Sequence, residues 1–306
     1  MLSRLLITLI VLAAIAAGIF YWLTQPMTVA AVEWPEGDAA RGETVFWTGG
    51  CASCHAVPKA ENDDLLKLAG GLALKTPFGT FYAPNISPDP TAGIGDWSGL
   101  DFVNAMTRGV SPDGRHYYPA FPYTSYQRMT LADLADLKAF LDGLPPVEVR
   151  APNHDLPFPF NIRRGLGLWK TLHLNGQPFQ PDPASDDVTN RGKYLVEGPG
   201  HCGECHTPRD FSGGLDRSLW LSGAPNPEGK GYIPNITSHE NGIASWSEND
   251  IAFSLETGFT PEFDVFGSSM ADVARNMSKV PAEDRAAIAK YLKSVPPLAG
   301  TRPKSP

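Results

Sequence analysis

The chain has 306 residues, of which 42% are hydrophobic and 19% are charged, and its formal net charge is −8 at pH 7. This length is sufficient for about two domains. The acidic balance argues against nucleic acid or anionic lipid as a binding partner, and it allows electrostatic docking of a basic protein.

An apolar run begins the chain. Arg4 precedes nineteen uncharged residues, Leu5 to Leu23, which is near the length of a membrane-spanning helix and longer than a usual signal-peptide core. We therefore predict that residues 1–26 are an uncleaved anchor in a bacterial inner membrane, with the rest of the chain in the periplasm. The alternative is cleavage by a signal peptidase after Val29-Ala-Ala31, which would release a soluble periplasmic protein.

The pattern Cys-x-x-Cys-His occurs at 51–55 and at 202–206, and it uses all four cysteines. It is the attachment signature of c-type haem, because two thiols three residues apart each form a thioether with one porphyrin and the next residue, histidine, binds the iron. A disulfide framework does not require the histidines, and a zinc site would join halves about 150 residues apart and leave both histidines unexplained. We predict two covalent haems, attached at Cys51, Cys54, Cys202 and Cys205, with His55 and His206 as the proximal iron ligands.

The chain repeats itself at an offset of 149–151 residues. Arg-Gly precedes each haem motif, Tyr-x-Pro-Asn-Ile follows each, and each half closes with an amphipathic helix and Pro-Pro. These repeats predict two copies of one helical module, at 37–150 and 186–300. The segment 151–185, rich in proline and aromatic residues, is predicted to wrap along both. No alternating strand pattern is evident, so we predict an all-α fold.

Each half resembles a class I cytochrome c domain, with a first helix, the haem motif, loops that carry a methionine, and a last helix that crosses the first. In that family a glycine on the first helix lets an aromatic residue of the last helix come close. Gly42 with Phe140, and Gly192 with Tyr291, occupy the matching places. The resemblance implies two tandem class I cytochrome c domains after an N-terminal transmembrane helix.

The larger pattern is similar to the cytochrome c subunits of bacterial membrane-bound alcohol, gluconate and fructose dehydrogenases. Those subunits usually carry three haems, whereas this chain has motifs for two. The resemblance implies single-electron transfer from a membrane-bound or periplasmic dehydrogenase toward an oxidase, a soluble cytochrome or quinone.

The sixth iron ligand differs between the halves. In the second half, Met270 stands at the family's methionine position, and Met277 is the alternative. A methionine opposite histidine raises the reduction potential and closes the iron to small ligands.

In the first half the matching position is Phe121, which cannot bind iron. Met129, just before the last helix, is our prediction there. Met106, His116 or an open iron are the alternatives.

Other matched residues have simpler interpretations. We expect Asn85 and Asn235 to form turns after proline. Arg41 and Arg191 are expected either to pair with haem propionates or to be exposed.

The sequence contains no nucleophile–base pair, phosphate loop or further metal cluster, so we expect an electron-transfer protein or subunit rather than an enzyme. The alternative is a dihaem oxidoreductase, a peroxidase or a sulfur-compound dehydrogenase, with an open first haem. A third possibility is a subunit that anchors a dehydrogenase to the membrane.

Overall fold

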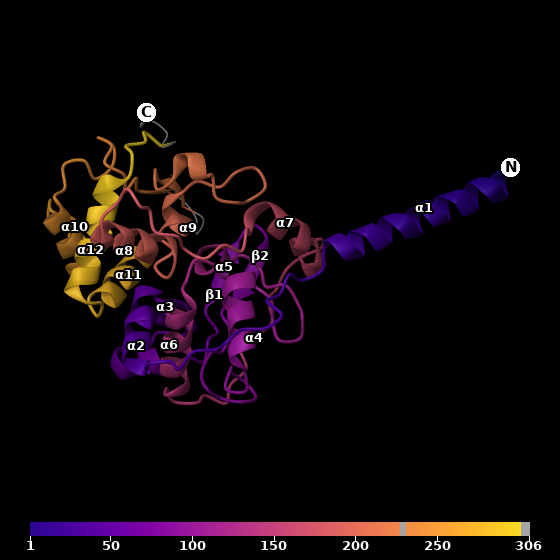
Figure 1. The fold of residues 1–306 in the computed structure, drawn as a ribbon, viewed down its shortest axis with the longest axis horizontal. Helices are drawn as coiled ribbons and strands as arrows, with labels where there is room; N and C mark the ends of the chain where they lie inside the picture. Colours follow the sequence, from indigo (N-terminus) through magenta and orange to yellow (C-terminus); the bar gives the residue numbers. More distant parts are fainter. Residues whose placement is uncertain (227–230, 301–306) are drawn as a thin grey trace.

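A computed structural model describes residues 1–226 and 231–300 of the chain. The architecture is mostly helical, with an isolated N-terminal helix and two small hairpins (Figure 1). We refer to residues 37–150 as the N-terminal half and to residues 186–300 as the C-terminal half. The elements of the N-terminal half are α2 Ala39–Thr48, α3 Cys51–His55, η1 Asn62–Leu66, β1 Ala73–Thr76, β2 Gly79–Tyr82, α4 Gly99–Val103, the π-helical turn η2 Asn104–Arg108, α5 Tyr123–Tyr126 and α6 Leu131–Asp142.

The segment between the halves contains η3 Arg163–Gly165 and α7 Leu166–His173. The elements of the C-terminal half are α8 Asp187–Glu197, α9 Gly203–His206, η4 Arg217–Leu219, β3 Ala224–Pro225, β4 Tyr232–Ile233, α10 Glu248–Thr257, α11 Ser269–Met277 and α12 Ala282–Ser294.

Helix α1, Leu2–Leu23, projects away from the rest of the molecule (Figure 1). None of its residues is buried, and it is long and apolar enough to cross a membrane, a criterion that an N-terminal signal sequence also meets. The residue after it, Thr24, is fully buried. Arg164 donates from Nε to Thr24 Oγ1 at 2.9 Å and from Nη2 to the Tyr21 carbonyl at 2.6 Å. The end of α1 is therefore fixed to the segment between the halves.

The first and last helices of each half cross at a glycine. A Cβ on Gly42 of α2 would overlap the Asp136 carbonyl of α6 and lie 2.9 Å from Phe140 Cβ. A Cβ on Gly192 of α8 would overlap the carbonyl oxygen of residue 287 in α12 and lie 2.8 Å from Tyr291 Cβ. The close approach that the family resemblance implies is thus present in both halves.

Helices at matching places in the two halves start with the same kind of side-chain N-cap. Asp38 Oδ1 accepts from the Arg41 amide at the start of α2, and Asp186 caps α8 in the same way. Ser98 and Ser247, each after a tryptophan, form capping boxes with the aspartate three residues later. Local sequence therefore sets the helix starts that position the haem motifs.

Two antiparallel hairpins depart from the predicted absence of strands. β1 pairs with β2, with Ala73 opposite Tyr82, and β3 pairs with β4, with Ala224 opposite Ile233. The strands have four and two residues, which is too short for an alternating pattern to be recognised in the sequence. The prediction of a helical fold otherwise agrees with the structure.

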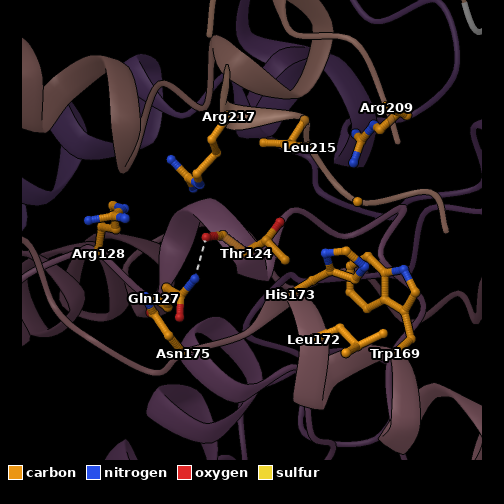
Figure 2. Close-up of a pocket in the computed structure, with 11 residues that line it drawn as sticks. Thr124, Gln127, Arg128, Trp169, Leu172, His173, Asn175, Arg209, Leu215 and Arg217 are labelled. Carbon is orange, nitrogen blue, oxygen red and sulfur yellow. Dashed lines mark hydrogen bonds between the residues drawn. The ribbon is translucent and has the colours of Figure 1, made fainter. Parts of the chain in front are cut away.

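The segment between the halves bonds to both of them. Asp155 exchanges two backbone hydrogen bonds with Thr80, at 2.8 and 2.9 Å, and Trp169 Nε1 donates to the carbonyl of Ser212 at 3.0 Å. Where α5, α7 and the loop 209–217 meet, they form a partly open cavity of about 320 Å³ (Figure 2).

Candidate functional site: two haem-attachment motifs

Each Cys-x-x-Cys-His motif forms a single helical turn. α3 follows Gly50, whose left-handed backbone (φ 58°) ends the preceding segment, and Cys202, the first cysteine of the second motif, directly precedes α9. Residues three apart on a helix share one face, so the thiols of each pair face the same side. Burial, and then the neighbouring thiol, raise the pKa of Cys51 and of Cys202 to about 12. No disulfide joins any of the four cysteines, all of which lie in the described part of the chain.

Both motif histidines are held by a proline carbonyl. His55 Nδ1 lies 2.8 Å from the Pro84 oxygen, and His206 Nδ1 lies 2.8 Å from the Pro234 oxygen. A carbonyl only accepts, so Nδ1 carries the proton and the lone pair of Nε2 is available to a metal. Burial lowers the pKa of both imidazoles, which favours the neutral form that ligates iron, while the carbonyls oppose the shift.

The two prolines belong to the Tyr-x-Pro-Asn-Ile repeats, and the asparagines that follow fix this loop. Asn85 is buried and donates from Nδ2 to the carbonyls of Val147 and Val149, at 2.7 and 2.8 Å. Asn235 donates likewise to the Leu298 carbonyl at 2.6 Å. Both also accept a backbone amide two residues on, as the predicted turns require. The repeat predicted the turns at these asparagines but not their hydrogen bonds to the C-terminal segment of each half.

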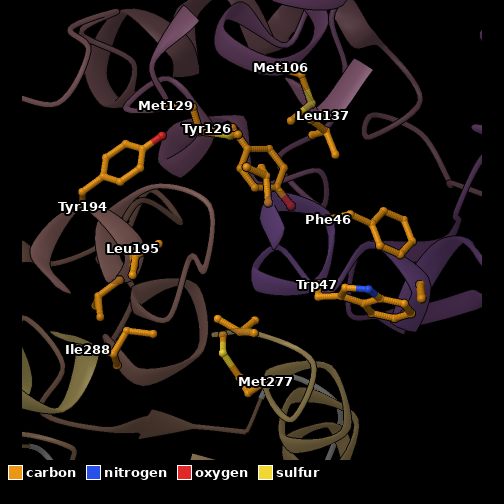
Figure 3. Close-up of a cluster of buried hydrophobic side chains, with 14 of the residues drawn as sticks. Phe46, Trp47, Met106, Tyr126, Met129, Leu137, Tyr194, Leu195, Met277 and Ile288 are labelled. Carbon is orange, nitrogen blue, oxygen red and sulfur yellow. The ribbon is translucent and has the colours of Figure 1, made fainter. Parts of the chain in front are cut away.

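The predicted sixth ligands have different surroundings. Met129 is 3% exposed and belongs to a buried cluster that also contains Met106 and Met277 (Figure 3). Met270, in the first turn of α11, is half-buried and packs against the same cluster.

Phe121 packs edge-on against Tyr126. Burial, and then the thiols of Cys51 and Cys54, raise the pKa of the Tyr126 hydroxyl. His116 is buried at the end of α1, where its Nε2 lies 3.0 Å from the Thr24 carbonyl. The structure therefore gives His116 a partner outside the haem motifs.

Comparison with known proteins identifies the family. Residues 39–145 match the family model described as Cytochrome c. Over 295 residues the chain is 53% identical to the diheme cytochrome c-type protein of Cereibacter sphaeroides, and the match covers 94% of this chain and 96% of that protein. The chain belongs to the cytochrome c family. It carries two covalently bound haem c groups.

Two further relatives are named as subunits of dehydrogenases. The cytochrome is 39% identical to the fructose dehydrogenase cytochrome subunit of Gluconobacter japonicus, over 85% of its own length and 53% of that subunit. It is 37% identical to the cytochrome c subunit of the quinone-dependent alcohol dehydrogenase of Gluconacetobacter polyoxogenes, over 88% of its own length and 59% of that subunit. The cytochrome thus spans little more than half of these relatives. These similarities confirm the resemblance inferred from the motifs and support a function in electron transfer.

The motif residues fit this cofactor. Paired thiols on one helical turn, followed by an imidazole whose Nδ1 is occupied by a carbonyl, match the donor set of a covalently attached haem.

The repeated arginines of the cytochrome pair with protein carboxylates. Arg41 donates from Nε and Nη2 to the carboxylate of Asp136 on α6, at 2.7 and 2.9 Å. Arg191 donates equivalently to Asp284 on α12, at 2.8 Å for both contacts. Each arginine thus joins the first helix of its half to the last. Sequence analysis did not foresee these pairs, because the partner lies more than ninety residues away.

The two haem motifs of the cytochrome meet at one junction between the halves. Ser53, between the cysteines of the first motif, accepts a 2.7 Å hydrogen bond from Asn276 Nδ2 of α11. Glu204, between the cysteines of the second, accepts from the hydroxyls of Thr124 and Ser125, at 2.7 and 2.8 Å. His201 Nε2 lies 3.2 Å from the Gly49 carbonyl. Each motif is therefore in direct contact with the opposite half.

Proposed function

We propose that this cytochrome accepts single electrons from a dehydrogenase, passes them between its two haem sites and delivers them to an oxidase, a soluble cytochrome or quinone. The observation that carries the proposal is the junction at which Ser53 and Glu204 each bond to the opposite half. Haem c supplies a one-electron iron couple when it is bound. The contribution of the chain is to attach the two groups next to one another and to fix their ligands.

The proposed ligand set combines the residues of the two motifs with one methionine for each iron. Cys51, Cys54, Cys202 and Cys205 would form the thioethers. His55 and His206 would hold the two irons through Nε2, and Met129 and Met270 would supply the second protein ligand of each. Met129 lies in the same buried cluster as Ala52 of the first motif, which supports Met129 for the first iron.

The proposed organisation is two tandem class I cytochrome c domains, at 37–150 and 186–300. The glycine crossings of α2 with α6 and of α8 with α12 support it, as does the bidentate arginine–aspartate pair beside each crossing. The family model itself covers the first of these halves.

The proposed location is the periplasmic face of the inner membrane, with α1 retained as an anchor. The burial of Thr24 and its contacts with Arg164 and His116 support retention, because cleavage after Ala31 would remove them. The proposed donor is a membrane-bound or periplasmic dehydrogenase, by analogy with the relatives named above.

Carbon monoxide binding to the chemically reduced protein tests this function against the enzyme alternative. If Met129 and Met270 complete both irons, carbon monoxide binds neither haem rapidly. Rapid binding at one haem would instead favour a dihaem oxidoreductase, such as a peroxidase or a sulfur-compound dehydrogenase.

The proposed electron donor is tested by isolating the cytochrome together with the proteins that bind it. Tagged cytochrome isolated from its host in mild detergent is expected to bring a stoichiometric dehydrogenase with it. The substrate of that dehydrogenase should reduce both haems within the isolated complex. Haems that stay oxidised in such a complex would contradict the proposed direction of transfer.

A further inference from the structure

The cavity of about 320 Å³ lies outside both haem motifs (Figure 2). Its walls come from α5 and the residues just after it, from α7, and from the loop 209–217, so all three parts of the body contribute. Three arginines, Arg128, Arg209 and Arg217, line it together with His173. Its size falls at the lower end of the range for small-molecule sites, about 300–1,000 Å³.

The arginines outnumber the carboxylates that neutralise them. Arg209 Nη2 pairs with Glu204 at 2.7 Å. Arg128 Nε lies 3.5 Å from Glu197, and this buried nitrogen has no hydrogen-bond partner. Arg217 has no carboxylate within salt-bridge distance among the described residues, and its guanidinium lies 5.1 Å above the Trp220 ring.

Arg128 and Arg217 also act on each other. Figure 2 shows both side chains on the same side of the cavity, away from Arg209 and His173. The pKa of Arg217 is lowered, first by burial and then by the Arg128 guanidinium, while the Glu197 and Glu204 carboxylates oppose the shift. Two neighbouring guanidinium groups repel each other, and an anion between them would remove that cost. The buried Arg128 Nε would also gain the acceptor that it lacks.

The opposite wall carries Arg209 and His173, with Trp169 and the 73% exposed Leu172 on the same side (Figure 2). A ligand with an oxyanion at each end of a short carbon chain would match both walls. We propose that this cavity binds a small oxyanion of the size of a dicarboxylate, held by Arg128 and Arg217.

Titration calorimetry of the oxidised holoprotein, at constant ionic strength, tests the proposal with succinate as the probe. Inorganic phosphate and the neutral diol of the same chain length are the comparison ligands. We expect saturable binding of succinate and none of the diol. Binding of succinate and phosphate alike identifies a general oxyanion site, whereas binding of succinate alone identifies a carboxylate site. No saturable binding of either anion, or equal competition by chloride, would overturn the proposal.

The variant Arg217→Gln should weaken succinate binding about tenfold or more, because one hydrogen-bonded guanidinium is lost. The matched control is Arg115→Gln, an exposed arginine that pairs with Asp113 and does not line the cavity. Equal loss in both variants would point to net charge rather than to a site. An unchanged haem spectrum and unfolding temperature verify that Arg217→Gln is folded.

In a second variant, a carboxylate of the protein itself takes the place of the bound oxyanion. Leu172→Glu places a carboxylate at the rim of the cavity, on a side chain that is already exposed. It should abolish succinate binding and raise the unfolding temperature. Combined with Arg217→Gln, it should no longer raise that temperature. Undiminished succinate binding by Leu172→Glu would contradict the assignment of this cavity.

Discussion

At the residue scale, the strongest constraint on the site is the hydrogen bond from each motif histidine to a proline carbonyl. His55 and Pro84 are 29 positions apart, and His206 and Pro234 are 28 apart, so the same loop closes over each motif. This bond fixes the ring orientation and the tautomer before any metal binds. Both motif histidines are thus held in the same way, and the proposed sixth ligands are where the two halves differ.

Replacing Met129 tests the distal side of the first site. In Met129→Ala we expect the first haem to lose its methionine-ligated low-spin spectrum and its midpoint potential to fall, while the second haem is unchanged. Because Met129 is buried, the change should also cost about 2–5 kcal/mol of stability. Met106→Leu is the matched control, since Met106 lies in the same buried cluster. An unaltered first-haem spectrum in Met129→Ala would transfer the role to Met106, His116 or an open iron.

A second residue-scale feature is the buried amine of Lys170. It is 2% exposed and donates to the carbonyls of Arg108 and Gly109, at 2.8 and 2.6 Å, above the ring of Tyr123. This contact ties α7 to the end of η2. Burial lowers the pKa of Lys170 from 10.5 to about 7.

The lowered pKa predicts a pH dependence of stability. Between pH 7 and 10.5 the unfolded chain binds more protons at this lysine than the folded chain, so the free energy of unfolding rises with pH. Relative to Lys170→Met, the native protein should gain stability from about pH 7 to about pH 9 and show a constant difference below that window. Denaturant midpoints across this range measure it, and Lys75→Met, at an exposed lysine, should show no such trend. Parallel curves for the native protein and Lys170→Met would refute the shift.

At the scale of elements, the crossing of α2 with α6 is the contact that assembles the N-terminal half. A side chain at Gly42 is excluded by the Asp136 carbonyl, and the Arg41–Asp136 pair closes the same contact from its rim. The C-terminal half repeats this arrangement around Gly192. Each pair of helices therefore meets backbone to backbone, which few residues other than glycine permit.

A single methyl group at this crossing should disrupt it. Gly42→Ala is expected to lower the free energy of unfolding by about 3 kcal/mol or more, because backbone rather than a flexible side chain must move. Gly165→Ala is the control, at a glycine with no other atom within 4 Å of the new Cβ. Denaturant unfolding of both proteins, followed by haem absorbance, measures the difference. Similar stabilities would mean that α2 and α6 do not pack as described.

At the scale of the whole molecule, one buried cluster runs through both halves, and the haem motifs lie at the junction between them. The hydrogen bonds of Ser53 and Glu204 fix this junction through the residues that separate each pair of cysteines. A change in the relative position of the halves would therefore move both motifs. Helix α1 projects away from the two halves, and the hydrogen bond from Arg164 to Thr24 fixes its end (Figure 1).

The orientation of α1 leads to a test of membrane anchoring. The full chain, expressed in a bacterium that attaches haem c, should remain in the membrane fraction after an alkaline wash. Deletion of residues 2–23 behind a cleavable signal sequence should release it with both haems intact, because no other described helix is long and apolar enough to span a membrane. Mass spectrometry of the membrane form should find residues 1–31 present. A mature chain that begins after Ala31 would establish the cleaved, soluble alternative.

The extent to which the sequence predicted this molecule depended on the distance between interacting residues. Cys51, Cys54 and His55 lie within one helical turn, so their spacing in the sequence was enough to predict haem attachment. The same holds for the second motif. Gly42 and Phe140 were found only through the family resemblance, because nearly a hundred residues separate them. The proline carbonyls escaped prediction since any residue type carries a carbonyl, and only the fold selects the one that reaches the imidazole.

The sequence by itself determined the cofactor class, the number of haem motifs, the repeat and the apolar helix at the N-terminus, because each depends on residue type and local spacing. The tertiary structure decided which groups face one another. It paired Arg41 with Asp136 and Arg191 with Asp284, brought Ser53 and Glu204 to one junction, and gathered Arg128, Arg209 and Arg217 around a cavity. These contacts join residues that no local pattern links, and they form only when the helices pack.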